Sequence, residues 1–314
     1  MGAGVSEEGR GGAALWWAAM QQAPGVGAAA MLRLARVFGS PEQAVNASAE
    51  NLMLRGGLSE QQAAYITSAV SGMAGLRRRL DLLVRQGITL CSLDEPTYPL
   101  GLRDLRSPPP LLYLRGELMA EDVRAVAVVG TREPDQAGRR LTKGIAQGLA
   151  ERGFTIVSGL ARGIDTAAHR GALAARTGRT VAVLGSGLLR IYPPENALLA
   201  SRVAGRGCLL SEVPPDTEVD RRFLLARDRI QAALSRAVIV VQAHAECGSI
   251  VTARHARRCG RLLLAVPWDT SPFREGWQKL RSMGAEPVGT DTDLDELARR
   301  LDARPEETSQ QSLG

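Results

Sequence analysis

The chain has 314 residues, of which 45% are hydrophobic, so it is long enough for two or three folded domains. Its net charge of +6 favours a polyanionic partner, although the excess of arginine over lysine equally fits codon bias in a GC-rich genome. The four cysteines lack a C-x-x-C pair, and we find neither a signal peptide nor an apolar run of about 18 residues. These features exclude a disulfide scaffold and a membrane protein, and they predict a cytoplasmic one.

The N-terminal quarter of the chain is predicted to be helical after a short tail. Residues 1–12 are polar and glycine-rich, and we expect disorder there. Residues 13–75 carry alanine and leucine at helical spacing, with breaks at 24–25 and 56–57, which predicts a small helical domain. The break at Pro24–Gly27 reads P-G-V-G and resembles the hairpin of a helix-hairpin-helix element, whose amides contact nucleic-acid phosphates. An ordinary helix–helix turn is the alternative, and both remain open.

Two further segments are predicted to flank the main domain. Residues 76–120 read as an extension packed on the core, with a helix from Arg77 to Gly87, strands at Ile88–Leu90 and Leu111–Leu114, and a proline-rich stretch between them. The three consecutive arginines at the start of that helix are typical of a solvated face. Residues 291–314 are polar, and we expect a C-terminal tail.

Residues 121–290 alternate apolar runs with amphipathic stretches, which is the pattern of a parallel α/β sheet. The predicted strands are 126–129, 154–157, Thr180–Leu184, Cys208–Leu210, Val238–Val241 and Arg261–Val266. Because these runs are almost continuously apolar, helices should cover both faces of the sheet. The sequence therefore predicts a doubly wound, Rossmann-like core.

Four loops rich in small residues follow the predicted strands. They are Gly130-Thr131-Arg132, the segment 158–163, Gly185-Ser186-Gly187 and Cys247-Gly248-Ser249. The carboxyl ends of parallel strands meet at one rim of a sheet, so all four loops should face the same side. Free backbone N–H groups and helix N-termini in such loops suit a phosphate, and two of the loops carry an arginine. We therefore expect a phosphate-bearing ligand at this rim.

Common nucleotide signatures are missing from these loops. The chain contains no G-x-G-x-x-G after its first strand and no G-x-x-x-x-G-K-[ST], so NAD, P-loop ATP and other cofactors are not expected. Asp165 and His169 share a helix face and lie near Ser158, but nothing there resembles the nucleophile elbow of a hydrolase. We interpret Asp165 as a helix cap, with His169 packed against it or contacting a ligand.

The segment after the predicted strand Val238–Val241 contains four residues of types that bind metal ions: His244, Cys247, His255 and Cys259. They fall on a strand end, a loop and a helix, and this placement need not bring His244 to the others. We therefore predict no metal site.

Longer motifs occur in a fixed order along the chain and resemble the DprA/Smf family of DNA-processing proteins. They include GTR at 130–132, SGLARGIDTAAHRGAL at 158–173, TVAVLGSGLLRIYPPEN at 180–196 and CGSIVTA at 247–253. The resemblance implies a Rossmann-like core behind a small helical domain. It also implies a non-enzymatic protein that binds single-stranded DNA, forms a homodimer and helps to load the RecA recombinase during natural transformation.

The same resemblance implies a set of binding residues, with Arg132 as the main phosphate-binding arginine and Tyr192 as the best candidate for base stacking. The residues expected to bind or shape the single-stranded DNA site are Gly130, Thr131, Arg132, Ser158, Gly159, Arg162, Gly163, Asp165, His169, Gly185, Ser186, Gly187, Tyr192, Asn196, Arg227, Arg229, Gly248, Ser249 and Thr252.

The chain also departs from the family pattern between residues 228 and 278. Asp228 replaces the asparagine of an R-N-R motif, and Gln242 stands where an acidic residue is expected. Cys247 and Trp268 replace a serine and a glycine. A small C-terminal domain that many members carry is not found. Asp228 adds negative charge near the predicted site, so the departures leave the ligand preference open.

Two other functions remain open on the sequence alone. One is an enzyme like the lysine-decarboxylase-like nucleotide phosphoribohydrolases of the LOG family, whose P-G-G-x-G-T motif carries a catalytic glutamate. Residues 245–249 lack its double glycine. The other is a nucleotide sensor on the same fold, because Rossmann-like folds serve many functions.

Overall fold

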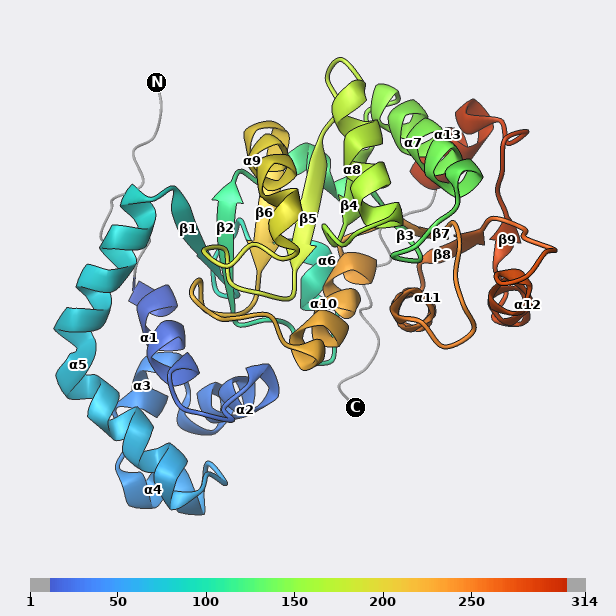
Figure 1. The fold of residues 1–314 in the computed structure, drawn as a ribbon. Helices are drawn as coiled ribbons and strands as arrows, with labels where there is room; N and C mark the ends of the chain where they lie inside the picture. The colour runs from blue at the N-terminus through green and yellow to red at the C-terminus, as the bar shows by residue number, and fades with distance from the viewer. Residues whose placement is uncertain (1–11, 304–314) are drawn as a thin grey trace. The chain divides into compact units, whose positions relative to one another are not determined.

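The computed structural model describes residues 12–303, so most of the tail expected at 1–12 lies outside the described residues. The chain divides into two compact units: unit 1 holds residues 1–98 and 106–113, and unit 2 holds residues 99–105 and 114–314 (Figure 1). No helix in the described part of the chain is long and apolar enough to cross a membrane.

Unit 1 is built mainly of helices. They are α1 (Gly12–Gln21), α2 (Ala28–Phe38), α3 (Pro41–Val45), α4 (Ala49–Leu54) and α5 (Glu60–Arg85), followed by strand β1 (Ile88–Ser92). Serine side chains at 40, 48 and 59 accept hydrogen bonds from backbone N–H groups in the first turns of α3, α4 and α5, which fixes where these helices begin. Trp17, Met20 and Leu34 are almost inaccessible and form part of the core of this unit.

The structure corrects the helix expected to begin at Arg77. That segment is the second half of α5, which starts seventeen residues earlier at a capping box formed by Ser59 and Gln62. Gly72 and Gly75 lie in the exposed interior of this helix, where each glycine is disfavoured relative to alanine by only about 1 kcal/mol. The turn at Pro24–Gly27 connects α1 and α2 as predicted, and its contact with DNA stays a prediction.

Unit 2 contains a parallel sheet with the strand order β6-β5-β4-β3-β7-β8-β9. These strands are β3 (Ala125–Val129), β4 (Thr155–Ser158), β5 (Thr180–Leu184), β6 (Gly207–Ser211), β7 (Ala237–Val240), β8 (Leu262–Ala265) and β9 (Glu286–Pro287), while β2 (Leu111–Gly116) lies across the division between the units. Strands β3 to β8 begin and end within one residue of their predicted positions.

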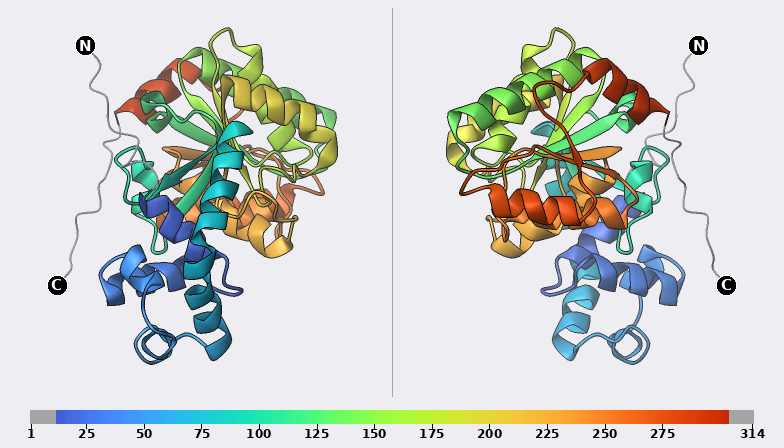
Figure 2. Two further views of the ribbon diagram at one scale, coloured as in Figure 1. Left: turned by 90° about the vertical axis from the view of Figure 1, so that its left-hand side faces the viewer. Right: turned by 90° about the vertical axis from the view of Figure 1, so that its right-hand side faces the viewer.

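Helices cover both faces of this sheet, which confirms the doubly wound prediction (Figures 1 and 2). One face carries α7 (Gln136–Glu151), α8 (Ile164–Ala174), α9 (Ala197–Arg206) and α13 (Leu294–Asp302), and the other carries α10 (Arg221–Ala233), α11 (Gly248–Arg258) and α12 (Arg274–Ser282). The short elements are α6 (Leu100–Arg103), η1 (Ala120–Val123) and η2 (Pro194–Asn196). Val126, Ile156 and Ile239 are fully buried at the centre of this layered core.

Helix α13 lies within the region expected to be a polar tail. Leu294, Leu297, Ala298 and Leu301 recur at helical spacing, and the last three are buried against the core of unit 2. The surrounding charges had masked this apolar stripe in the sequence.

The order of the strands positions the candidate site. β3 has β4 on one side and β7 on the other, so the direction of winding reverses between β3 and β7. Ligands of open α/β sheets bind beside such a reversal, at the carboxyl ends of the strands. Here those ends lead into residues 130–132, 159–163 and 241–248.

Candidate phosphate-binding site

A pocket opens at the carboxyl ends of the strands in unit 2. Its lining consists of Arg132, Gly159, Ala161, Arg162, Tyr192, Pro193 and Leu224, and we call it the Arg132 pocket. Four of these residues were predicted from the sequence: Arg132, Gly159, Arg162 and Tyr192. Two arginines and one tyrosine therefore face a single pocket, as a ligand with phosphate and aromatic groups requires.

Arg132 has a fixed backbone and a free side chain. The Thr131 N–H donates to the Gln242 carbonyl (2.6 Å), and the Ile164 N–H donates to the Thr131 carbonyl (3.1 Å). The backbone of Gly163 packs closely against that of Arg132, so a Cβ at position 163 would lie 2.6 Å from the Arg132 carbonyl oxygen. The φ of +77° at Gly163 also favours glycine. The exposed Arg132 guanidinium makes no hydrogen bond or ion pair within residues 12–303, so its donors are available to an anion.

Arg162 lines the pocket from the loop after β4, and its side chain has a partner. Its Nε donates to the Glu195 carboxylate, and this contact raises the pKa of Arg162 and lowers the pKa of Glu195. Both side chains are largely exposed, and ion pairs in water are weak. A phosphate can therefore replace Glu195 as the partner of Arg162.

Asp165 and His169 lie beneath the pocket and are buried. Asp165 Oδ2 accepts from the N–H groups of Gly159 (3.1 Å) and Ala161 (3.4 Å). His169 Nε2 accepts from the Leu160 N–H (3.3 Å). These three amides were expected to face open space, but the structure turns them inward, so the loop offers side chains rather than these N–H groups to a ligand.

The same contacts assign supporting roles to the two residues. His169 Nδ1 lies 2.7 Å from Thr180 Oγ1, whose hydroxyl donates to the Ile156 carbonyl, so Nδ1 is the donor and the ring is neutral. Burial, followed by the charge of Arg227, lowers the pKa of His169 to about 3. The N-cap of α8 is Gly163, so Asp165 does not cap that helix as expected but holds the preceding loop.

Ser158 takes no part in a hydrolytic arrangement with these residues. Its hydroxyl donates to the Val128 carbonyl (2.7 Å), and both nitrogens of His169 are engaged elsewhere. Nucleophilic catalysis needs a serine hydroxyl that donates to a base. The arrangement therefore does not support a role for Ser158 as the nucleophile of a hydrolase.

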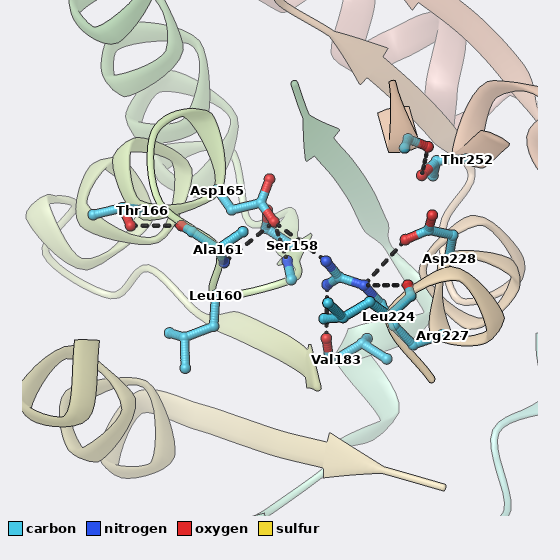
Figure 3. A network of polar contacts seen from close by, with 12 residues as sticks. Ser158, Leu160, Ala161, Asp165, Thr166, Val183, Leu224, Arg227, Asp228 and Thr252 are labelled. Atoms are coloured by element: carbon cyan, nitrogen blue, oxygen red, sulfur yellow. Dashed lines mark hydrogen bonds and ion pairs between the residues drawn. The ribbon is translucent and has the colours of Figure 1, made fainter. Parts of the chain in front are cut away.

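Arg227 is buried and links three elements behind the pocket (Figure 3). Its Nη1 donates to the Val183 carbonyl (2.9 Å), and its Nε donates to the Leu224 carbonyl (3.2 Å). The guanidinium occupies the space beside Gly159, where a Cβ would lie 1.3 Å from Nη1. Arg227 therefore supports the Arg132 pocket from behind, and its donors point into the protein.

Two carboxylates flank the Arg227 guanidinium. Asp228 Oδ1 lies 3.0 Å from Nε, and Asp165 Oδ2 lies 3.8 Å from Nη2. We call these three side chains the Arg227 cluster. Burial raises the pKa of Asp228 to about 7 and also raises that of Asp165, although Arg227 acts in the opposite direction on both.

Other predicted residues shape the surroundings. Asn196 Nδ2 donates to the Leu160 carbonyl (2.8 Å) and to Thr166 Oγ1 (2.9 Å), which ties the loop after β5 to the loop after β4. Gly185 and Gly187 allow Leu224 and Pro215 to approach closely.

The remaining predicted residues lie outside the pocket lining. Ser186 is buried, and its carbonyl accepts from the Ser211 hydroxyl (2.9 Å). Arg229 pairs with Glu212. Gly248, Ser249 and Thr252 form the first turns of α11: Thr252 donates to the Gly248 carbonyl (3.4 Å), and Ser249 contacts the Cys247 thiol (2.8 Å). Gly130 packs against Ile164.

Of the other three lining residues, Ala161 and Pro193 lie in segments that the sequence already assigned to this site, the loop 158–163 and the motif 180–196, whereas Leu224 was not predicted. Leu224 comes from α10 on the other face of the sheet, and no local signal connects it with the loops after β3 and β4.

Two of the departures from the family pattern, Gln242 and Trp268, make hydrogen bonds to the backbone. Gln242 Oε1 accepts from the Asp135 N–H (3.2 Å) and packs against Gly138. The Trp268 indole N–H donates to the Val241 carbonyl. Both side chains therefore stabilise the core beside the switch between β3 and β7.

The four residues considered as metal ligands, His244, Cys247, His255 and Cys259, do not come together. The His244 ring packs on Phe273 with 5.1 Å between centroids, while His255 and Cys259 lie at the other end of α11 from Cys247. Within residues 12–303 no three His, Cys, Asp or Glu side chains are placed to hold a metal ion.

The fold and the pocket together define a Rossmann-like α/β protein with arginines at the carboxyl ends of its strands. The sequence profile of the family DNA recombination-mediator protein A matches residues 89–301. The chain therefore belongs to this family, which confirms the resemblance to DprA/Smf proteins.

Individual relatives agree with this assignment. Protein Smf of Synechocystis sp. is 38% identical over 256 residues, covering 80% of this chain and 64% of the relative. The chain thus spans less than two thirds of that protein. The DNA processing protein DprA of Bacillus subtilis is 36% identical over 228 residues, covering 72% of this chain and 76% of the relative.

Solved structures show the same fold. The DNA processing protein A of Streptococcus pneumoniae superposes with a TM-score of 0.77 at 30% identity, covering 90% of this chain and 97% of that one. The corresponding protein of Helicobacter pylori gives a TM-score of 0.60 at 29% identity, covering 68% and 95%.

Proposed function

We propose that the protein binds single-stranded DNA at the Arg132 pocket without catalysing a reaction on it. The observation that carries this proposal is the exposed guanidinium of Arg132, which has no partner within residues 12–303 and faces the same pocket as Arg162 and Tyr192. The structure of the Helicobacter pylori relative concerns that protein's single-stranded DNA binding mode, which supports the same class of ligand here.

Binding at this pocket is driven mainly by phosphates. Arg132 contacts one phosphate directly, and Arg162 contacts a second after exchanging Glu195 for it. Tyr192 presents an exposed ring on which one base stacks. Because these contacts read the backbone and a ring face, affinity depends little on base sequence and falls as salt concentration rises.

Two partners follow from family membership rather than from the pocket. The protein acts as a homodimer and helps to load the RecA recombinase onto the bound strand during natural transformation. Light scattering at micromolar concentration tests the first statement, and a monomer contradicts it. Stimulation of RecA loading onto single-stranded DNA by the purified protein tests the second, and its absence contradicts it.

The test of the proposed function is fluorescence anisotropy of the purified protein with labelled oligo-dT and with the matching duplex across a salt series. We expect submicromolar binding of the single strand, weaker binding of the duplex and a clear salt slope. Equal affinity for the duplex, or no binding at low salt, contradicts the proposal. Tight binding of a mononucleotide without DNA affinity indicates a sensor, and release of base from a nucleoside monophosphate indicates an enzyme.

A further inference from the structure

The Arg227 cluster holds more negative than positive charge in a buried place. The side chains of Asp165, Arg227 and Asp228 are 6%, 8% and 7% exposed. With both carboxyls ionised, the three groups sum to one negative charge shielded from water. Buried charge without a partner is strongly disfavoured, so this cluster tends either to take up a proton or to attract a further cation.

The two carboxyls differ in how well their charge is stabilised. Asp165 accepts two backbone N–H bonds from the loop after β4, which favours its ionised form. The ionised form of Asp228 is stabilised by Arg227, which also contacts Asp165, and by the charge of Arg132. Asp228 is therefore the carboxyl of the cluster with fewer stabilising contacts.

Asp228 also lies next to the Arg132 pocket. Leu224 lines the pocket one helical turn before Asp228 on α10, and Gly159 lines it while contacting Arg227. On the other side, a Cβ on Gly248 would lie 3.7 Å from Asp228 Oδ2, and Figure 3 shows Asp228 between Arg227 and Thr252. The carboxyl thus stands between the pocket and the start of α11.

We infer that the Asp228 carboxyl sets the strength of phosphate binding at the Arg132 pocket and couples that binding to uptake of a proton. When Asp228 is ionised, it attracts Arg132 and repels an incoming phosphate. When Asp228 is neutral, it neither attracts Arg132 nor repels the phosphate, and the net charge around the pocket is positive. This inference rests on the proposed function.

The groups around Asp228 agree with this assignment. Arg227 on its own helix and Arg132 from the loop after β3 favour the charged form, while Asp165 from α8 opposes it. From α11 the neighbouring Gly248 and Thr252 carry no charge. Burial has the largest influence and outweighs the two arginines, so the pKa of Asp228 is raised to about 7 and the carboxyl changes charge within the physiological range.

The size of the effect follows from proton linkage. A bound phosphate disfavours the ionised form, so the pKa of Asp228 rises in the complex. For a rise of about one unit from 7, affinity increases about fivefold between pH 8 and pH 6. The direction is fixed, because the complex holds more protons than the free protein in this range.

The experiment compares wild type, Asp228→Asn and Glu151→Gln by anisotropy at pH 6, 7 and 8. The probe is oligo-dT without a terminal phosphate, because its phosphodiesters do not titrate in this range. Asp228→Asn removes the charge and keeps the shape. Glu151→Gln removes an exposed carboxylate at the far end of α7, before β4.

We expect wild type and Glu151→Gln to bind about fivefold more tightly at pH 6 than at pH 8. Asp228→Asn should bind equally at all three values, matching wild type at pH 6 and exceeding it about fivefold at pH 8. A wild type without pH dependence, or an Asp228→Asn variant that keeps it, overturns the inference while leaving the proposed function intact. Wild type that binds no DNA at any pH removes the proposed function and the inference with it.

Discussion

Replacing Gly159 by alanine should destabilise unit 2 strongly, because the new methyl group and the Arg227 guanidinium would occupy the same space. A Cβ at this position would lie 1.3 Å from Nη1 and 2.1 Å from Cζ of Arg227. The guanidinium is buried and donates to the carbonyls of Val183 and Leu224, so it cannot move without losing these bonds. Each hydrogen bond of a charged group contributes about 1.5–3 kcal/mol.

Displacing Arg227 also removes the positive charge between Asp165 and Asp228. Breaking a buried ion pair by removing one partner destabilises proteins by about 3–5 kcal/mol. We therefore expect Gly159→Ala to lower the free energy of unfolding of unit 2 by about 3 kcal/mol or more.

Chemical denaturation followed by circular dichroism measures this difference. The matched control is Gly144→Ala on α7, where a Cβ meets nothing within 4 Å. A glycine-to-alanine change at such an exposed helical position should stabilise the protein by about 0.5–1 kcal/mol. If Gly159→Ala loses less than about 1 kcal/mol, the guanidinium is not held in place as described.

Three further substitutions test other contacts. Glu195→Gln frees Arg162 from its partner and should tighten oligo-dT binding about twofold in anisotropy; weaker binding would contradict the exchange of Glu195 for phosphate. His169→Ala leaves the buried Leu160 N–H unpaired and removes one of the two hydrogen bonds of the Thr180 hydroxyl, so it should lower the free energy of unfolding by about 2–4 kcal/mol in urea; a change near zero would contradict its supporting role. Asp228 has a raised folded pKa, so the native state gains stability as pH falls through 7; Asp228→Asn should stabilise the protein more at pH 8 than at pH 5 in thermal unfolding, and a pH-independent difference would refute this.

The strands of the sheet could be predicted closely from the sequence, because each strand is marked by its own run of residues. Strands such as β3 and β5 are almost continuous apolar runs that are followed directly by Gly130 and Gly185. The helices were harder to delimit. The predicted boundary between residues 75 and 76 falls inside α5, and α13 was missed because its narrow apolar stripe lies among charged residues.

The candidate site was only partly predictable, because its contacts join distant segments. Arg132 and Arg162 were identified from the loops that carry them. The sequence did not show that Arg227 points inward, or that Asp165 accepts the amides of the loop after β4. The inward position of Arg227 depends on the packing of α10 against β5, which brings it into contact with Val183, 44 positions earlier in the chain. The contacts of Asp165 are local, but they depend on how the loop after β4 turns its amides inward.

The central claim is that Arg132 binds phosphates of single-stranded DNA. The most direct measurement is the salt dependence of oligo-dT affinity for wild type, Arg132→Ala and Arg176→Ala. Arg176 is an exposed arginine between α8 and β5, at the opposite rim of the sheet, and its loss removes the same charge. We predict that Arg132→Ala weakens binding of all base sequences alike and lowers the slope of log affinity against log salt by about 0.7, while Arg176→Ala changes neither. Unchanged affinity in Arg132→Ala, or an equal loss in both variants, would contradict the claim.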